Sequence, residues 1–116
     1  MKIIEIPRDD FPRIVVLCGS TRFPDAWRDA TRAESLEGRI VLSVGVMIHA
    51  GAEPIRDDSP AKVALDELHK RKIDLADEVL VLNVGGYVGA STRSEIEYAI
   101  AHGKPVRYLE SLEVRA

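Results

Sequence analysis

The sequence predicts an α/β sandwich in which a doubly wound parallel sheet of four to five strands lies between layers of helices. Short runs of apolar, mostly β-branched residues lack alternating polar positions, which is typical of strands buried on both faces of a parallel sheet. Segments with helical signals separate these runs, so strands and helices alternate and require right-handed crossovers. With 116 residues, the chain has room for one domain, residues 1–116.

The first half of the chain contains two predicted strands and one helix. Residues 14–18 form the first strand, and a helix follows over residues 24–37, because proline suits a first helical turn and a glycine follows the helix end. Residues 40–44 form the second buried strand. Residues 45–59 contain several Gly and Pro residues and are predicted to be a long loop, a kind of connection that is often functional in a compact domain.

The second half repeats the alternation. Ser59 and the proline after it predict a helix start, and apolar residues at helical spacing extend this helix to about residue 76. The third buried strand is predicted over residues 79–83, and a glycine-rich turn follows it. Ser91 or Thr92 can cap a helix that runs to residue 102, and the fourth strand covers residues 105–109.

This architecture predicts where a ligand binds. In open parallel sheets, the ligand crevice lies outside the carboxyl ends of the strands, where the strand order reverses. Three connections of this chain are expected to meet there, namely residues 19–24, 45–59 and 83–95.

The amino-acid composition argues against several classes of protein function. The chain has 16 Lys and Arg against 19 Asp and Glu, a net charge of −3, which argues against binding to a nucleic-acid polymer. No run approaches the roughly eighteen apolar residues of a membrane span, and the amino-terminal residues do not form a secretory signal, so we expect a cytoplasmic protein.

The single cysteine, Cys18, excludes an intramolecular disulfide framework and a cysteine-based zinc site, and we expect it to be inert packing. The histidine spacing predicts no metal site.

The first candidate site is the segment Gly19, Ser20, Thr21 and Arg22, between a strand and a helix. Glycine permits a tight turn, backbone N–H groups near a helix start can cradle an anion, and the hydroxyls and guanidinium add donors to a phosphate. The segment matches neither a Walker A loop nor a dinucleotide fingerprint. The alternative is a plain turn with a solvated arginine.

The second candidate is Glu95, which is predicted to lie in the first turn of the last helix, where the helix dipole would keep it ionised. An inward carboxylate near the hydroxyls of Ser91 and Thr92 could serve as a nucleophile or as an electrostatic stabiliser. A structural capping role is the alternative.

Other candidates are acid–base and aromatic residues. Asp66 and His69 are three residues apart and share a helix face, so they could act together. Phe23 and Tyr87 fall in the predicted crevice loops and could stack on a flat base. The basic residues 70–72 are predicted to be a solvated helix face.

Several of these segments, taken in order, resemble a known family. They are Leu-Cys-Gly-Ser-Thr-Arg at 17–22, Ile-Asp-Leu-Ala-Asp-Glu-Val-Leu-Val at 73–81, and Ser-Glu-Ile-Glu-Tyr-Ala at 94–99 with Gly-Lys-Pro-Val at 103–106. The set resembles the nucleoside 2-deoxyribosyltransferase superfamily, and Cys-Gly-Ser-x-Arg is most similar to its 2′-deoxynucleoside 5′-monophosphate N-glycosidase branch. The resemblance covers residues 14–109. It implies a flavodoxin-like, Rossmann-like domain that forms homodimers or larger homo-oligomers and uses no metal or organic cofactor.

The resemblance also implies roles for the candidates. Glu95 matches the nucleophile that attacks the anomeric carbon, expels the base and forms a glycosyl-enzyme ester, which water or a second base resolves. Residues 19–22 match the cradle of the 5′-phosphate. Gly89 aligns with a phosphate-contacting serine, and Ser91, Thr92 and Arg93 would support the same end of a small-molecule nucleotide.

Three positions depart from the family pattern. His69 stands where the family has an aspartate that handles protons, so His69 or the nearby Asp66 is the expected acid–base partner. Val16 and Gly45 replace a tyrosine and a histidine of the monophosphate branch. The sequence therefore predicts hydrolysis of a nucleoside 5′-monophosphate or analogue. The alternatives are a non-catalytic nucleotide sensor, base exchange between nucleosides and, more remotely, a phosphoribohydrolase.

Overall fold

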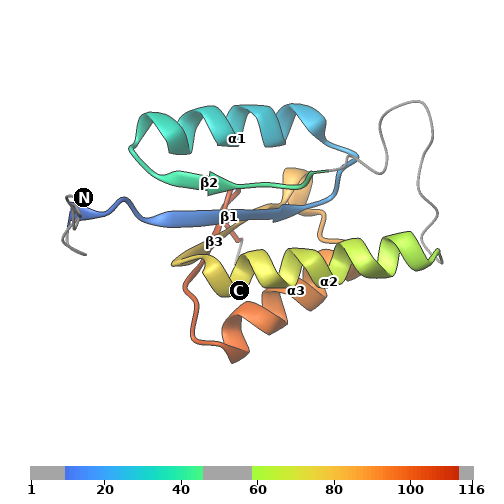
Figure 1. Ribbon diagram of the computed structural model, residues 1–116. Coiled ribbons are helices and arrows are strands. Elements are labelled where there is room, and N and C mark those ends of the chain that lie inside the picture. The colour runs from blue at the N-terminus through green and yellow to red at the C-terminus, as the bar shows by residue number, and fades with distance from the viewer. Residues whose placement is uncertain (1–9, 46–58, 113–116) are drawn as a thin grey trace, which may run out of the picture.

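The computed structural model describes residues 10–45 and 59–112. The elements within these ranges are β1 (Ile14–Gly19), α1 (Pro24–Leu36), β2 (Ile40–Leu42), α2 (Pro60–Leu75), β3 (Glu78–Leu82), the short 3-10 helix η2 (Val84–Gly86), α3 (Ala90–Ala101) and β4 (Val106–Tyr108). Four strands form one parallel sheet in the order β2-β1-β3-β4. Helix α1 covers one face of the sheet, and α2 and α3 cover the other (Figure 1). The predicted α/β sandwich is confirmed.

Strand β1 lies between two hydrophobic cores. Val15 and Leu17 pack with Trp27 of α1 in one cluster. Val16 and Cys18 belong to a second cluster with residues of α2, β3 and α3. Because successive strand side chains point to opposite faces of a sheet, a continuous apolar run is what this central position requires. The interpretation of residues 14–18 as a strand buried on both faces is confirmed.

Strand β2 is shorter and more exposed than predicted. It covers Ile40–Leu42 rather than residues 40–44, and Ile40 is 37% exposed. Strand β2 pairs only with β1, so it lies at an edge of the sheet, and its residues are half-buried or exposed. The prediction of a fully buried second strand was wrong, because strand order, which an apolar run does not encode, decides which strand is central.

The helix starts differ in how well they were predicted. Ser59 caps α2 as expected, since its Oγ accepts a hydrogen bond from the backbone N–H of Lys62 at 3.1 Å. Helix α3 begins one residue before Ser91, and its N-cap is Gly89, which makes no side-chain capping bond. Ser91 and Thr92 therefore lie inside the helix rather than at its cap. Glu95 consequently falls in the second turn of α3, not in the first.

The predicted crevice lies where the strand order reverses. The chain passes from β1 to β2 at one edge and returns to β3 on the other side of β1, so the switch point lies between β1 and β3. Of the three connections expected there, residues 46–58 of the long loop lie outside the described residues. No helix in the described part of the chain is long and apolar enough to cross a membrane.

Gly19 is required by strand packing and not by the turn for which it was predicted. It is the last residue of β1, paired with Leu82 of β3. A Cβ atom at Gly19 would lie 2.9 Å from the Cβ of Leu82 and 3.2 Å from its backbone oxygen. Only a residue without a side chain therefore fits where β1 and β3 end beside the crevice.

Gly19→Ala is expected to lower the free energy of unfolding by about 1–3 kcal/mol, because the added methyl group overpacks the β1–β3 contact. Gly45→Ala is the matched control, since a Cβ at Gly45 meets no atom of the described residues within 4 Å. The control should stay within about 0.5 kcal/mol of wild type. Urea unfolding followed by circular dichroism measures both, and equal stabilities of the two variants would contradict the role given to Gly19.

Candidate active site

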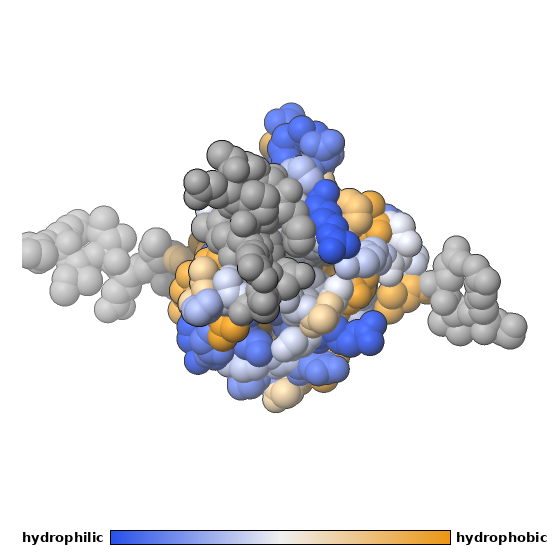
Figure 2. All heavy atoms as spheres, turned by 90° about the vertical axis from the view of Figure 1, so that its right-hand side faces the viewer, coloured by the Kyte–Doolittle hydropathy of each residue, from blue (hydrophilic) through white to orange (hydrophobic). Residues whose placement is uncertain are grey.

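A cavity of about 460 Å³ opens beside the carboxyl ends of β1 and β3. This volume lies within the usual range for a small-molecule site. The cavity is lined by all the site residues predicted from the sequence except Phe23 and Arg93. Figure 2 views the molecule from this side, where hydrophilic and hydrophobic areas lie next to one another on the surface. The position agrees with the crevice expected from the strand order.

The loop after β1 is held by its own hydrogen bonds and by one buried side chain. The Ser20 carbonyl accepts hydrogen bonds from Phe23 N at 3.3 Å and from the indole Nε1 of Trp27 at 3.0 Å. Ser20 Oγ accepts another from Arg22 N at 3.2 Å. Trp27 is only 2% exposed, so its ring anchors the loop to the core below α1. Ser20 and Thr21 are thereby presented to the cavity on a fixed backbone.

Tyr87 joins the loop after β1 to the loop after β3. Arg22 Nη1 donates to the Tyr87 hydroxyl at 3.3 Å, and the guanidinium carbon lies 5.7 Å from the centroid of the Tyr87 ring. The Phe23 ring meets Tyr87 edge-on at a centroid distance of 6.0 Å. Arg22 and Tyr87 line the cavity, whereas Phe23 supports Tyr87 from outside it. Phe23 and Tyr87, the two aromatic residues predicted for the crevice, therefore do contact each other, but only Tyr87 lines the cavity.

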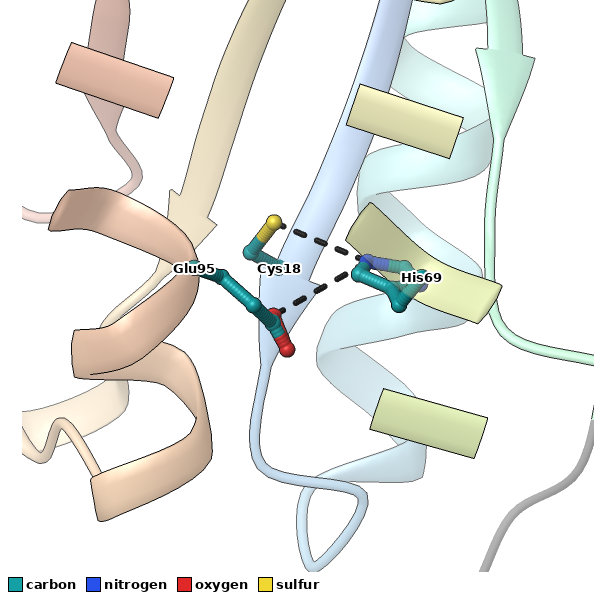
Figure 3. A group of neighbouring side chains, drawn as sticks. All are labelled: Cys18, His69 and Glu95. Carbon is teal, nitrogen blue, oxygen red and sulfur yellow. Dashed lines mark hydrogen bonds and ion pairs between the residues drawn. The ribbon is translucent and has the colours of Figure 1, made fainter. Parts of the chain in front are cut away.

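Three buried side chains from different elements meet at the base of the site. Cys18 of β1, His69 of α2 and Glu95 of α3 point toward one another (Figure 3). His69 Nε2 lies 3.6 Å from Cys18 Sγ and 4.0 Å from Glu95 Oε2. Glu95 is 7% exposed and lines the cavity, and its Oε2 has no hydrogen-bond partner among the described residues. A buried carboxylate oxygen without a partner is costly, and such groups are typical of functional sites.

The surroundings of Glu95 oppose its charge. Burial is the main cause that raises its pKa from an ordinary 4.5 to about 7, and the nearby charge of Asp66 acts in the same direction. A hydrogen bond with the Cys18 side chain opposes this shift most, and the positive charges of Lys62 and Lys70 also lower the pKa. The helix dipole was expected to keep Glu95 ionised, but Glu95 lies beyond the first turn, where the dipole has faded, and burial opposes its charge. At neutral pH the carboxyl group is divided between its protonated and ionised forms.

His69 and Cys18 hold protons in this arrangement. His69 Nε2 lies 2.8 Å from the Leu17 carbonyl, which can only accept, so Nε2 carries the hydrogen. Burial lowers the pKa of His69, which favours the neutral ring, and burial also raises the pKa of the Cys18 thiol well above its ordinary value. Cys18 thus contacts both functional side chains, although it was expected to be inert packing.

The donor atoms of Cys18, His69 and Glu95 lie within 4.8 Å of one another, close enough to suggest a metal site. Metal ligation needs an ionised thiol and a free imidazole lone pair at the coordinating nitrogen. The Nε2 hydrogen, which the Leu17 carbonyl accepts, opposes this. The three groups are better suited to proton-linked chemistry at Glu95 than to holding a metal.

Sequence reasoning missed two cavity lysines. Lys62 donates to Asp66 Oδ1 at 2.5 Å and to Ser91 Oγ at 2.7 Å, and Lys72 donates to the Ser43 carbonyl at 2.6 Å. Lys62 is four residues before Asp66, a spacing that places the pair on one helix face and could have revealed it. Lys72 belongs to the stretch interpreted as a solvated helix face, but it is half-buried and lines the cavity.

The remaining predicted residues are divided between the cavity and the surface. Gly89, Ser91 and Thr92 line the cavity at the start of α3, whereas Arg93 is exposed and not part of the lining. Apolar side chains from α2 and from the segment that follows β2 complete the wall, including Leu65 and Val44. The site thus combines an apolar wall, hydroxyls, cations and one buried carboxyl group.

Neither the scan against protein-family models nor the search of curated proteins finds a match for this chain.

Proposed function

We propose that this protein hydrolyses the N-glycosidic bond of a nucleoside 5′-monophosphate or a close analogue. The observation that carries the proposal is the buried Glu95 carboxyl group, which lines a cavity of ligand size and whose Oε2 has no hydrogen-bond partner among the described residues. The family resemblance of the ordered segments supports the same activity. Glu95 and the loop that begins at Gly19 stand where that resemblance requires a nucleophile and a phosphate cradle.

In the proposed reaction, ionised Glu95 attacks the anomeric carbon of the sugar. The bond to the base breaks, its electron pair passes to the base nitrogen, and a proton neutralises the departing base. Water then attacks the glycosyl ester, releases the sugar phosphate and restores the carboxylate. Asp66 and His69 are the titratable groups on the same cavity wall that could carry these protons, and Asp66 is the more accessible.

The proposed phosphate end lies between Arg22 and the start of α3. Gly89 makes no side-chain capping bond, and the first backbone N–H groups of a helix lack partners within the helix. Such N–H groups attract anions, as does the guanidinium of Arg22. The hydroxyls of Ser20, Thr21 and Ser91 line the same cavity. Together these groups supply donors for a phosphate without a metal.

Arg22→Met is expected to weaken the binding of a nucleoside 5′-monophosphate about 10- to 100-fold, because it removes a charge-assisted hydrogen bond. The affinity for the corresponding nucleoside should change little. Arg32→Met, on the exposed face of α1, is the control and should leave both affinities unchanged. Calorimetry with the nucleotide and nucleoside measures these affinities, and an equal loss for both ligands would refute the phosphate role.

The direct test is mass spectrometry of the products after the full chain is incubated with ribo- and deoxyribonucleoside 5′-monophosphates. Release of free base and sugar phosphate is the expected result. Adding a second free base distinguishes hydrolysis from base exchange, which would yield a new nucleoside. Binding without release of base from any of these nucleotides would refute the proposed activity.

A non-catalytic nucleotide-binding module is the second candidate. It is favoured by His69, which stands where the resembled family has an aspartate and whose Nε2 hydrogen is engaged by the Leu17 carbonyl. A sensor of this kind would bind nucleotides in the same cavity and release no base.

We also propose that the protein is a homodimer or a larger homo-oligomer in the cytoplasm. Four large apolar side chains are more than half exposed on α2 and α3, namely Val63, Leu68, Leu75 and Ile100. Exposed apolar side chains grouped on neighbouring elements favour self-association. Light scattering of the purified chain tests this part of the proposal.

A further inference from the structure

Lys62 is buried in the wall of the cavity, although lysine rarely is. Its ammonium donates to Asp66 Oδ1 at 2.5 Å, four residues later on α2, and to Ser91 Oγ at 2.7 Å on α3. Ser91 Oγ in turn donates to Asp66 Oδ2 at 3.3 Å. These three residues, here called the Lys62 brace, form a closed ring of hydrogen bonds that ties α2 to α3.

The Lys62 brace lies next to the pair formed by His69 and Glu95. Ser91 is four residues before Glu95 on α3, and Asp66 is three residues before His69 on α2. Residues with these spacings are neighbours on one helix face. The brace and the His69–Glu95 pair, whose Nε2 and Oε2 atoms are 4.0 Å apart, therefore lie next to each other between the same two helices. A change in the brace is therefore a change in the surroundings of Glu95.

We propose that Lys62 is a positioning residue for Glu95, which it serves by joining α2 to α3 through Asp66 and Ser91 and by neutralising the Asp66 carboxylate beside the Glu95 carboxyl. The catalytic consequence rests on the function proposed above. The positioning itself does not, because it is a property of the protein without substrate.

Charged and titratable groups reach Glu95 from two neighbouring elements. Strand β1 contributes Cys18, and α2 contributes His69, Asp66, Lys62 and Lys70. Asp66 raises the pKa of Glu95, and Lys62 and Lys70 lower it. Removing Lys62 leaves the Asp66 charge uncompensated, whereas removing Asp66 leaves the Lys62 charge uncompensated. The two substitutions must therefore shift the titration of Glu95 in opposite directions.

The experiment follows the Glu95 carboxyl carbon by NMR in the full chain labelled with ¹³C at its glutamate carboxyl groups. Glu95→Gln identifies the signal by its loss. Lys62→Met is expected to raise the titration midpoint by about one pH unit, and Asp66→Asn to lower it by a similar amount. The double variant should titrate close to the wild-type midpoint. Lys62→Arg should also titrate near that midpoint, because the positive charge is kept.

Lys70→Met is the matched control. It removes one positive charge from the same helix, but Lys70 lies over the Tyr98 ring, at 5.9 Å from its centroid, and is not part of the brace. Its shift should be clearly smaller than that of Lys62→Met. An equal shift would overturn the proposal, because general charge loss would then explain the result. Shifts of the same sign for Lys62→Met and Asp66→Asn would overturn it as well.

Ser91→Ala tests the mechanical part of the brace without changing a charge, and it serves if Lys62→Met does not fold. The loss of the hydrogen bonds between the helices is expected to move the Glu95 carbon signal and to lower kcat more than it raises KM. An unchanged signal in a folded Ser91→Ala variant would refute positioning through Ser91. Because the NMR titration needs no turnover, a chain that titrates as expected but releases no base would refute only the proposed function.

Discussion

Glu95→Gln is expected to reduce the release of free base at pH 8 by about 10⁴-fold or more, because glutamine cannot form the glycosyl ester. Affinity for the nucleotide should stay within about threefold of wild type, since the amide is nearly the same shape as the carboxyl group. Product assays by mass spectrometry and calorimetry with the nucleotide measure the two effects separately. The pH of 8 ensures that wild-type Glu95, with a pKa of about 7, is ionised.

Glu97→Gln is the control for this prediction. It removes a carboxylate two residues further along α3, at an exposed position that is not part of the cavity lining. Its rate of base release should equal that of wild type within a factor of about two. A Glu95→Gln variant that releases base as fast as the Glu97→Gln control would exclude Glu95 as the nucleophile.

The same variant is expected to be more stable than wild type at alkaline pH. Burial raises the pKa of Glu95 from 4.5 to about 7, so the folded state binds this proton more tightly than the unfolded state. The resulting stabilisation is fully present below pH 4.5 and is lost as pH rises through 7. The full shift corresponds to about 3 kcal/mol, an order-of-magnitude figure for a group that is 7% exposed.

Thermal unfolding at pH 5 and pH 8 measures this difference. Wild type should lose about 2–3 kcal/mol relative to Glu95→Gln between these pH values, because glutamine stays neutral throughout. The Glu97→Gln control should follow wild type. If wild type and Glu95→Gln respond equally to pH, Glu95 is not held in a setting that opposes its charge. Such a cost in stability is typical of functional groups, whose environments favour activity over folding.

Local sequence patterns predicted much of the candidate site. The segment after the first strand and the start of the last helix were both expected at the crevice, and Ser20, Thr21, Arg22 and Glu95 do line the cavity. These placements could be predicted because a parallel sheet brings the carboxyl ends of its strands to one edge. They needed only the order of the elements along the chain.

The environment of each side chain was harder to predict. Glu95 was expected to be ionised, yet burial against β1 and α2 favours its neutral form. Lys62 has the spacing of an ordinary surface ion pair with Asp66, yet it is 8% exposed because Ser91 of α3 completes its contacts. Cys18 and His69 are 51 residues apart and meet at 3.6 Å. Contacts of this kind depend on how α2 packs against α3 and the sheet.

Hydrophobic runs, caps and breakers thus determined the class of fold, because they act within a few residues of one another. The tertiary structure decided which strands lie at the edge, as β2 does, and why Gly19 admits no side chain. It also decided the proton state of Glu95, since desolvation depends on atoms brought together from β1, α2 and α3. Spacing along the chain can place a carboxyl group on a helix, but only packing removes the water that would keep it charged.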